Sequence, residues 1–313
     1  MARTRKTGSD PSKTAPALRW PQEKRLAFIE FRLLWEGRIN RSDLCTFFGI
    51  SIPQAALDLA QYRKLAPDNL DYDSHARQHV PGRHFRPVLI DGSAQDYLNR
   101  LRLVAEGLLP ADQSGISHLP SFEILRPPAR HIESRVLRAV LDAIHSGSAM
   151  EVLYQNTSNP EPRWRFVVPH ALASDGKRWH VRVRGRDNGH YWDMLLARIL
   201  DVGKTEPDDP RPQDDRQWQE MIVVRLGPNP DFSVLQKKVI ELDLGMENGE
   251  LRVDVRKSML FYFIQMMNID MYEGEGGGPR RPRDQPLFLL NREEVKEVLG
   301  SDLAASYRHL PKN

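Results

Sequence analysis

Apolar residues in the first part of the chain recur every three or four positions, which is the spacing of helices that bury one face. One such stripe over residues 26–34 predicts a first helix, ended by Gly37. A shorter stripe predicts a second helix over 41–48, and after a glycine turn a third begins at Ser51 with the S-x-x-Q pattern of a capping box. Residues that alternate from Leu70 onward predict a small hairpin. Three helices followed by a hairpin predict a winged helix-turn-helix.

A winged helix-turn-helix places its third helix in the major groove of DNA, where outer side chains read bases and nearby basic groups contact phosphates. The candidate DNA-binding residues are Arg41, Ser51, Gln54, Leu57, Asp58, Gln61, Arg63, Lys64 and Arg77. Base reading would depend on Gln54 and its neighbours, because the first turns of the helix contain neither Arg nor Lys. The alternative is a three-helix domain that is structural or binds protein, since a fold alone does not prove DNA contact.

The pattern changes after this region. Residues 93–130 contain one more amphipathic helix and a loop rich in Ser, Gly and Pro, which predicts a connector. An amphipathic helix over 131–145 follows, and then short segments in which apolar and polar residues alternate. Four or five strands within about 55 residues, joined by short turns, predict a small and strongly bent sheet or barrel.

The sequence KRWHVRVRGR forms the middle strand of this sheet and alternates two kinds of side chain. The odd-numbered positions 179 to 183 are apolar, whereas the even-numbered positions, His180, Arg182 and Arg184, are basic. Same-face residues of a strand lie about 6.6–7 Å apart, so the basic side chains form a ladder that suits an extended polyanion. The alternative is an ordinary half-buried strand whose basic face lies in water.

The last part of the chain begins with the run EPDDPRPQDD, whose Pro and Asp content predicts a linker. Beyond it, alternating strand and helix patterns predict a third domain of the α+β class. The segment KSMLFYFIQMMNID is a helix that is apolar almost all round, which is more apolar surface than a helix of so small a domain buries. Contact with a second subunit would cover the surplus, and the candidate dimerisation residues are Met259, Phe261, Phe263 and Met267.

These patterns predict a multidomain α+β protein, and 313 residues suffice for two or three domains. The expected parts are a flexible basic tail (1–18), the winged helix-turn-helix (19–92), a helical connector (93–130), the sheet domain (131–205), a linker (206–219) and the C-terminal domain (220–313). The tail is expected to be flexible because its small, basic and proline-punctuated sequence cannot bury enough apolar surface to order itself.

Cysteine content, apolar runs and charge indicate which classes of protein the sequence excludes and which kind of partner it favours. A single cysteine, Cys45, excludes internal disulfides and cysteine-based metal clusters. No run of about 18 apolar residues is present, and the first residues lack the apolar core of a signal peptide, so we expect a cytoplasmic protein. Residues 1–92 contain 15 basic and 10 acidic residues, whereas residues 204–313 contain 16 and 20. This gradient favours an anionic partner for the front of the chain.

Motifs of catalysis are absent from the sequence. It has no glycine-rich phosphate loop, no H-E-x-x-H and no G-x-S-x-G, and its histidines show no metal-ligand spacing on one element. We therefore expect neither an enzyme nor a bound cofactor or metal. A nuclease that acts through an unrecognised cluster of carboxylates is the remaining enzymatic alternative.

Residues 20–270 resemble the bacterial WYL-domain transcriptional regulators, and most closely the CapW/BrxR group, which represses anti-phage defence operons. The matching text is GISIPQAALDLAQYRKLAPDNLDYD, then VLYQN, RWRFVVPHAL, RWHVRVRG and LARI, and finally LDLGMENGELRVDVRKSMLFYFI. The Trp-Tyr-Leu triplet that names the domain reads Trp179-His180-Val181 here. The resemblance implies a winged helix-turn-helix, a WYL domain built as a small Sm-like or SH3-like barrel, and a C-terminal dimerisation extension.

The resemblance also implies that the WYL domain has a basic pocket for a nucleic acid or nucleotide. The matching candidate ligand-binding residues are Tyr154, Gln155, Arg165, His170, His180, Arg182, Arg184 and Arg198. The expected function is that of a homodimeric repressor, bound to a palindromic operator upstream of a defence operon and regulated by an anionic effector. The second hypothesis is a sensor or adaptor that binds single-stranded nucleic acid and represses no promoter.

Overall fold

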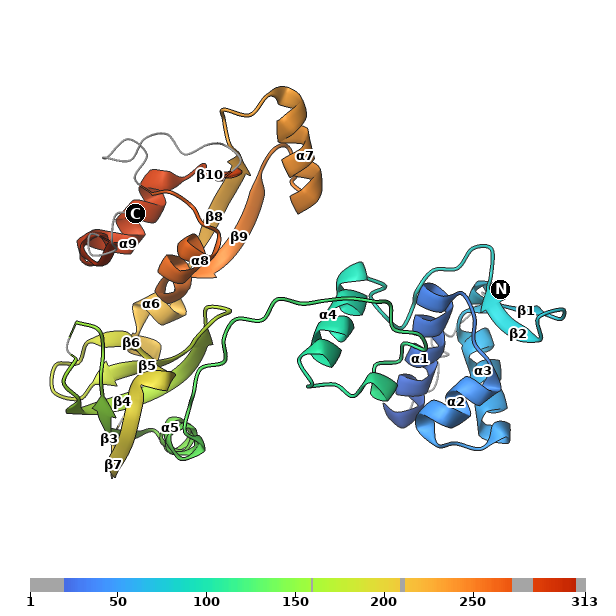
Figure 1. Ribbon diagram of the computed structural model, residues 1–313, viewed down its shortest axis with the longest axis horizontal. Helices are drawn as coiled ribbons and strands as arrows, with labels where there is room; N and C mark the ends of the chain where they lie inside the picture. The colour runs from blue at the N-terminus through green and yellow to red at the C-terminus, as the bar shows by residue number, and fades with distance from the viewer. Residues whose placement is uncertain (1–19, 159, 209–211, 272–283, 308–313) are drawn as a thin grey trace, which may run out of the picture. The chain divides into compact units, whose positions relative to one another are not determined.

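The computed structural model divides the chain into two compact units, residues 1–126 and 127–313 (Figure 1). The residues that it describes are 20–158, 160–208, 212–271 and 284–307. The predicted basic tail, residues 1–18, lies outside the described residues. Among the described helices, none combines the length and hydropathy that crossing a lipid bilayer would need.

The first unit begins with the predicted winged helix-turn-helix. Its elements are α1 (Trp20–Glu36), α2 (Arg41–Phe48), α3 (Ile52–Leu65), β1 (Leu70–Asp73) and β2 (Gln78–Pro81). The two strands pair antiparallel, and an isolated bridge joins Ile39 to His79 at the base of the hairpin. Apolar residues of the three helices form one core, which contains Leu26, Ile29, Leu33, Leu44, Leu59 and Tyr62. Gly49 ends α2 in the left-handed conformation (φ 65°), which is why the tight turn before α3 uses glycine.

A buried carboxylate, Glu30, fixes the segment after the hairpin. It accepts hydrogen bonds from the Tyr62 hydroxyl at 2.8 Å and from the backbone N–H groups of Val88, Leu89 and Ile90 at 2.7–2.9 Å. A buried charge needs several donors to replace water, and the donors that Glu30 uses hold this segment against α1.

The predicted connector begins with α4 (Ala94–Ala105), which belongs to the core of the first unit. Leu101 of α4 is buried together with Phe31 of α1 and Ile116 of the following loop. The helix is therefore anchored to the winged helix-turn-helix.

The second unit opens with α5 (Ser134–Ser146) and one antiparallel sheet, in the order β6-β5-β4-β3-β7. Its strands are β3 (Ser148–Tyr154), β4 (Arg163–Ser174), β5 (Trp179–Gly185), β6 (Tyr191–Leu195) and β7 (Ile199–Pro207). The Sm-like or SH3-like barrel that the resemblance implies is not confirmed, because within the described residues no ladder joins the two edge strands, β6 and β7. The sheet buries its apolar face without closure, since α5 packs against β3, β4 and β7 through residues such as Val136 and Val140.

A smaller α+β layer completes the second unit. A three-stranded sheet in the order β10-β8-β9 packs with the helices that follow each strand. The elements are α6 (Arg216–Gln219), β8 (Met221–Pro228), α7 (Val234–Leu244), β9 (Leu251–Arg256), α8 (Leu260–Met266), β10 (Leu287–Leu289) and α9 (Arg292–Tyr307). The predicted linker 206–219 is partly structured, because its first residues end β7 and its last residues form α6.

Candidate functional site

The N-terminus of α3 agrees only in part with the capping box that the sequence predicts. The Ser51 hydroxyl accepts from the Gln54 backbone N–H at 3.4 Å, but the Gln54 side chain donates to Asp58 at 3.1 Å, so the reciprocal half of the capping box is not made. Asp58 is fully buried and pairs with Arg25 of α1 at 2.6 Å. The expectation that Asp58 lies on the outer side of α3 is therefore wrong, since this carboxylate holds α3 to α1.

The outer side of α3 and the hairpin presents side chains suited to DNA. Ser51 is exposed, Gln54 and Gln61 are partly exposed, and Leu57 is 64% exposed. The predicted phosphate-contacting cations are all exposed, and no carboxylate of the described residues lies within salt-bridge distance of them: Arg41, Arg63, Lys64 and Arg77. Two exposed apolar side chains on this surface were not predicted as DNA-binding, Ile52 at the start of α3 and Tyr72 in β1.

Cations from two helices converge on the hairpin. Burial lowers the pKa of His79 in β2, and the charges of Arg63 and Arg41 lower it further. His79 is therefore neutral at neutral pH, and the positive potential at this point comes from the two arginines. The signal that the sequence offers for this cluster is the basic last turn of α3.

The basic ladder of β5 is not in water. Val181 and Val183 face the apolar core with α5, as predicted, but His180 and Arg182 on the opposite face are only 2% and 3% exposed. The alternative of a basic face that lies in water is therefore wrong for His180 and Arg182, because segments of the C-terminal layer cover them. Trp179, the first residue of the strand, lies beyond the core and is 52% exposed.

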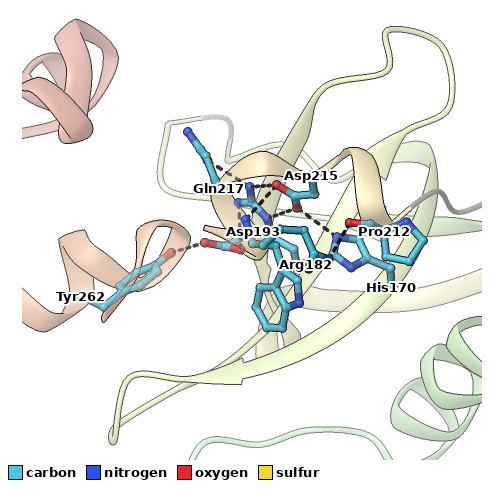
Figure 2. Close-up of polar contacts among 9 residues, drawn as sticks. His170, Arg182, Asp193, Pro212, Asp215, Gln217 and Tyr262 are labelled. Atoms are coloured by element: carbon cyan, nitrogen blue, oxygen red, sulfur yellow. Dashed lines mark hydrogen bonds and ion pairs between the residues drawn. The ribbon is translucent and has the colours of Figure 1, made fainter. Parts of the chain in front are cut away.

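Buried carboxylates neutralise Arg182. Its Nε and Nη2 atoms donate to the two oxygens of Asp215 at 2.7 and 2.9 Å, and Nη1 donates to Asp193 at 3.3 Å (Figure 2). Asp215 also contacts His170 Nε2 at 3.1 Å, and the Tyr262 hydroxyl of α8 donates to Asp193 at 3.2 Å. Such bidentate, charge-assisted pairing compensates for the loss of water around both charges.

The pKa shifts agree with this pairing. Burial alone would raise the pKa of Asp215, but hydrogen bonds from His170 and Arg182 outweigh burial and hold the pKa well below its usual range. Burial raises the pKa of Asp193, against the attraction of Arg182. Burial also lowers the pKa of His180, although Asp175 opposes the shift. His180 therefore contributes no positive charge to the ladder at neutral pH.

Every member of the ladder has an acidic partner within the chain. His180 lies 3.2 Å from Asp175, and Arg184 donates to Asp208 at 2.8 Å. Together with Arg182, these residues form a set of internal ion pairs and hydrogen bonds, which we call the paired ladder.

The other predicted ligand-binding residues do not join the paired ladder, apart from His170. Tyr154 is buried and its hydroxyl accepts from the Leu195 N–H at 3.2 Å. The Gln155 side chain donates to the Pro160 carbonyl. Arg165 is partly exposed on β4. Arg198 lines a separate cavity of about 570 Å³.

A metal site is not indicated by the described residues, which contain no group of three His, Cys, Asp or Glu side chains able to hold an ion. Among the described residues, the geometry comprises the helix α3, whose exposed cations have no carboxylate partner, and a five-stranded sheet with the paired ladder and a second basic cluster around Arg198.

Comparisons with known proteins cover both units. Family models match residues 21–103 as the winged helix-turn-helix domain of the BrxR transcriptional regulator, 135–203 as a WYL domain, and 221–295 as the BrxR C-terminal dimerization domain. The DNA-binding transcriptional repressor CapW of Escherichia coli (strain KTE188) is 37% identical over 297 residues, covering 93% of this chain and 96% of the relative. The CapW repressor of Pseudomonas aeruginosa is 37% identical over 294 residues, covering 92% and 95%.

The chain belongs to the CapW/BrxR family of transcriptional regulators. The family resemblance expected from the sequence is thus confirmed. CapW relatives are DNA-binding repressors, so the family is regulatory rather than enzymatic.

The C-terminal domain of this CapW/BrxR member places its apolar residues differently from the prediction. Met259, Phe261, Phe263 and Met267 are partly buried against the core of their own domain. The most exposed apolar side chains of the described domain lie instead on α7, where Val234, Leu235, Val239 and Leu242 are between 64% and 85% exposed. The four residues on and beside α8 therefore stay predicted dimerisation residues, and α7 is an apolar surface that the sequence reading missed.

Proposed function

We propose that this protein is a homodimeric transcriptional repressor that binds an inverted-repeat operator upstream of an anti-phage defence operon. The outer side of α3 would read bases through Gln54 and its neighbours in the major groove. Arg41, Arg63, Lys64 and Arg77 would contact phosphates. An anionic effector, a nucleic acid or nucleotide, would regulate the repressor at the WYL domain.

The observation that supports DNA binding most directly is the group of unpaired cations around α3 and the hairpin. Cations that already have carboxylate partners gain little from phosphate, because they must first lose those partners. The exposed cations of this surface have no such competitor among the described residues. They are therefore available for the counterion release that drives DNA binding.

The test is a footprint of the full-length protein on the DNA upstream of its own gene, with affinities measured at several salt concentrations. Gln54→Ala should relax base preference, whereas Arg63→Ala and Lys64→Ala should weaken binding to every sequence. Arg102→Ala is the control, because Arg102 is an exposed cation of α4 that pairs with Glu106, and α4 lies on the other side of α1 from α3 (Figure 1).

Protection of two half-sites spaced by whole helical turns would support a two-fold repressor. Unchanged affinity in all three variants would remove α3 from the groove. Binding to single strands with no protected promoter site would favour the sensor or adaptor instead.

The dimer and the effector are separate parts of the proposal. The match to a dimerization domain supports a dimer held by residues 221–295, and Met259, Phe261, Phe263 and Met267 are candidates for its contact. For the effector, the WYL domain contains two basic clusters, the paired ladder of β5 and the cavity that Arg198 lines.

A further inference from the structure

The cavity that Arg198 lines is built from three segments of the second unit. Residues 127–132 lead into α5, residues 177–179 open β5, and residues 195–198 follow β6. Its volume of about 570 Å³ lies within the range of pockets that hold small organic ligands. The three segments are far apart in sequence, so the cavity is a product of the fold.

The lining of this cavity is basic and contains no acidic residue. Arg178 and His131 have partners nearby, Asp175 and Glu133, each at 2.7 Å. The remaining cations, Arg130, Lys177 and Arg198, have no carboxylate within salt-bridge distance among the described residues. Like charges gathered without counter-ions favour the binding of an anion.

The cavity also has an aromatic wall. Trp179 is 52% exposed at this point, beside the apolar side chains of Ile132 and Leu195. An exposed indole next to cations suits a planar ring that stacks while its charge is bound close by. An inorganic anion would use the cations and leave the indole in water.

From these features we propose that the cavity binds an anion attached to an aromatic ring, namely a nucleotide or the phosphorylated end of a nucleic-acid strand. The inference rests on the proposed function, because it gives the effector a place on the WYL domain. An anion that entered the paired ladder would have to displace Asp215 and Asp193 from Arg182. The cavity requires no such displacement.

Binding there has a direct consequence for the connector. Arg130 belongs to the first residues of the second unit, whereas Lys177 and Arg198 belong to the sheet domain. A phosphate held by all three would fix residues 127–132 on the sheet domain. The segment through which the chain enters this unit would then have fewer orientations. The proposed regulation would act through that restriction.

The test is isothermal titration of full-length protein with inorganic phosphate, a nucleoside monophosphate, a short 5′-phosphorylated single strand and an abasic strand of the same length. Lys177→Ala with Arg198→Ala should weaken binding of the nucleotide or strand about tenfold or more, because charge-assisted contacts are lost. Trp179→Ala should weaken only the ligands that have bases, again about tenfold. Arg138→Ala is the control, since Arg138 is an exposed cation of α5 outside the lining.

Preference for the mononucleotide or for the strand would identify the source of the ligand. Unchanged binding in the double variant, or an equal loss in Arg138→Ala, would overturn the proposal. Trp179→Ala without effect would overturn its aromatic part. Operator binding without ligand is measured in parallel, so failure of the repressor function is distinguished from failure of this site.

A second, independent observation concerns α7. Leu235, Val239 and Leu242 are spaced by four and then three residues, which is the spacing of a seam between two packed helices. None of the residues of α7 is buried in the described structure. A helix that exposes such a seam is incompletely packed as a single copy.

The charges of α7 indicate which partner fits. Lys237 and Lys238 lie in its first half and Glu241 and Asp243 in its second, which is opposite to the arrangement that the helix dipole favours. In an antiparallel pair of identical helices, each basic half lies opposite the acidic half of the other copy. We propose that α7 packs antiparallel against α7 of a second copy. This inference deepens the proposed homodimer.

Light scattering of the full-length protein tests it. Leu235→Asp with Leu242→Asp should convert the dimer to a monomer, whereas Leu108→Asp, at an equally exposed leucine of the first unit, should not. Lys238→Glu should weaken the dimer, because it places an acidic side chain opposite the acidic half of the partner helix. Asp243→Lys added to it should restore the dimer, because the facing halves then again carry opposite charges. A dimer that survives the leucine variants, or that dissociates only with Met266→Asp on α8, would overturn the assignment.

Discussion

Two basic clusters of the WYL domain differ in one respect. The paired ladder of β5 is buried and each of its charges is compensated within the chain, whereas the cavity that Arg130, Lys177 and Arg198 line has no acidic residue. A basic residue in the sequence can therefore have either of two roles. Compensated cations stabilise the fold, and uncompensated cations remain available to an external anion.

The same distinction applies to the first unit. Arg25 pairs with buried Asp58, whereas Arg63 and Lys64, on α3 with Asp58, have no acidic partner among the described residues. We therefore expect substitutions of paired cations to affect stability and substitutions of unpaired cations to affect binding.

The largest expected effect is that of removing Arg182. Arg182→Ala leaves Asp215 and Asp193 buried without their cation, which should lower the free energy of opening of the sheet by about 3–5 kcal/mol. Hydrogen exchange of the β4 and β5 amides measures this. Lys177→Ala is the matched control and should change it by less than about 0.5 kcal/mol. Equal effects of the two substitutions would contradict the distinction.

A smaller loss is expected at the paired cation of the first unit. Arg25→Ala removes the partner of Asp58 and should destabilise the winged helix-turn-helix by about 1–3 kcal/mol, because a hydrogen bond to a buried charge is lost. Hydrogen exchange of the α1 and α3 amides is the measurement. If Arg25→Ala instead altered base preference with unchanged exchange, Asp58 would belong to the DNA-binding surface.

For the unpaired cations of α3 we expect a change in binding alone. Arg63→Ala and Lys64→Ala should each reduce the slope of log affinity against log salt by about one unit, as for one lost phosphate contact. The thermal stability of both variants should match that of the wild type. A loss of stability without a change of slope would place these side chains with the structural cations.

The smallest effect concerns pH. The pKa of His180 is lowered by burial, so the unfolded chain binds the proton more readily than the folded chain. Stability from this residue is thus complete above the ordinary pKa of 6.5 and is lost as pH falls through the folded value. The titratable and charged groups around His180 include Asp175, Asp193, Arg178 and the ring of Tyr262.

Urea unfolding on both sides of pH 6.5 checks this expectation for the wild type and for His180→Asn. His79 in the first unit has a lowered pKa of the same sign, so the difference between the two proteins isolates His180. Identical pH profiles would show that His180 does not contribute.

The sequence predicted what local pattern determines. The helices of the first unit follow from apolar spacing and from end signals such as Gly49 and Ser51, which act within a few residues. The alternation of β5 was also predicted correctly, since side chains of a strand point to opposite faces by geometry.

Non-local contacts explain what the sequence did not predict. Asp215 is 33 residues from Arg182, and Tyr262 is 69 residues from Asp193, so no window of sequence indicates that they cover β5. The open sheet was not predicted for the same reason: closure would need pairing between β6 and β7, two strands that are not neighbours in the sheet. The cavity required the meeting of three separate segments, and of its cations only Arg198 was predicted as ligand-binding.

The position of Asp215 has a consequence for modular exchange between family members. A WYL domain excised at the end of its last strand, Pro207, would retain Arg182 and leave behind both Asp215 and the 3.0 Å contact to Gln217. Arg182 on its middle strand would then keep only Asp193 as an acidic partner and would lose the bidentate pair with Asp215. The smallest piece that can be transplanted therefore extends through α6. A chimaera joined at the end of β7 would contain Arg182 without Asp215 and Gln217.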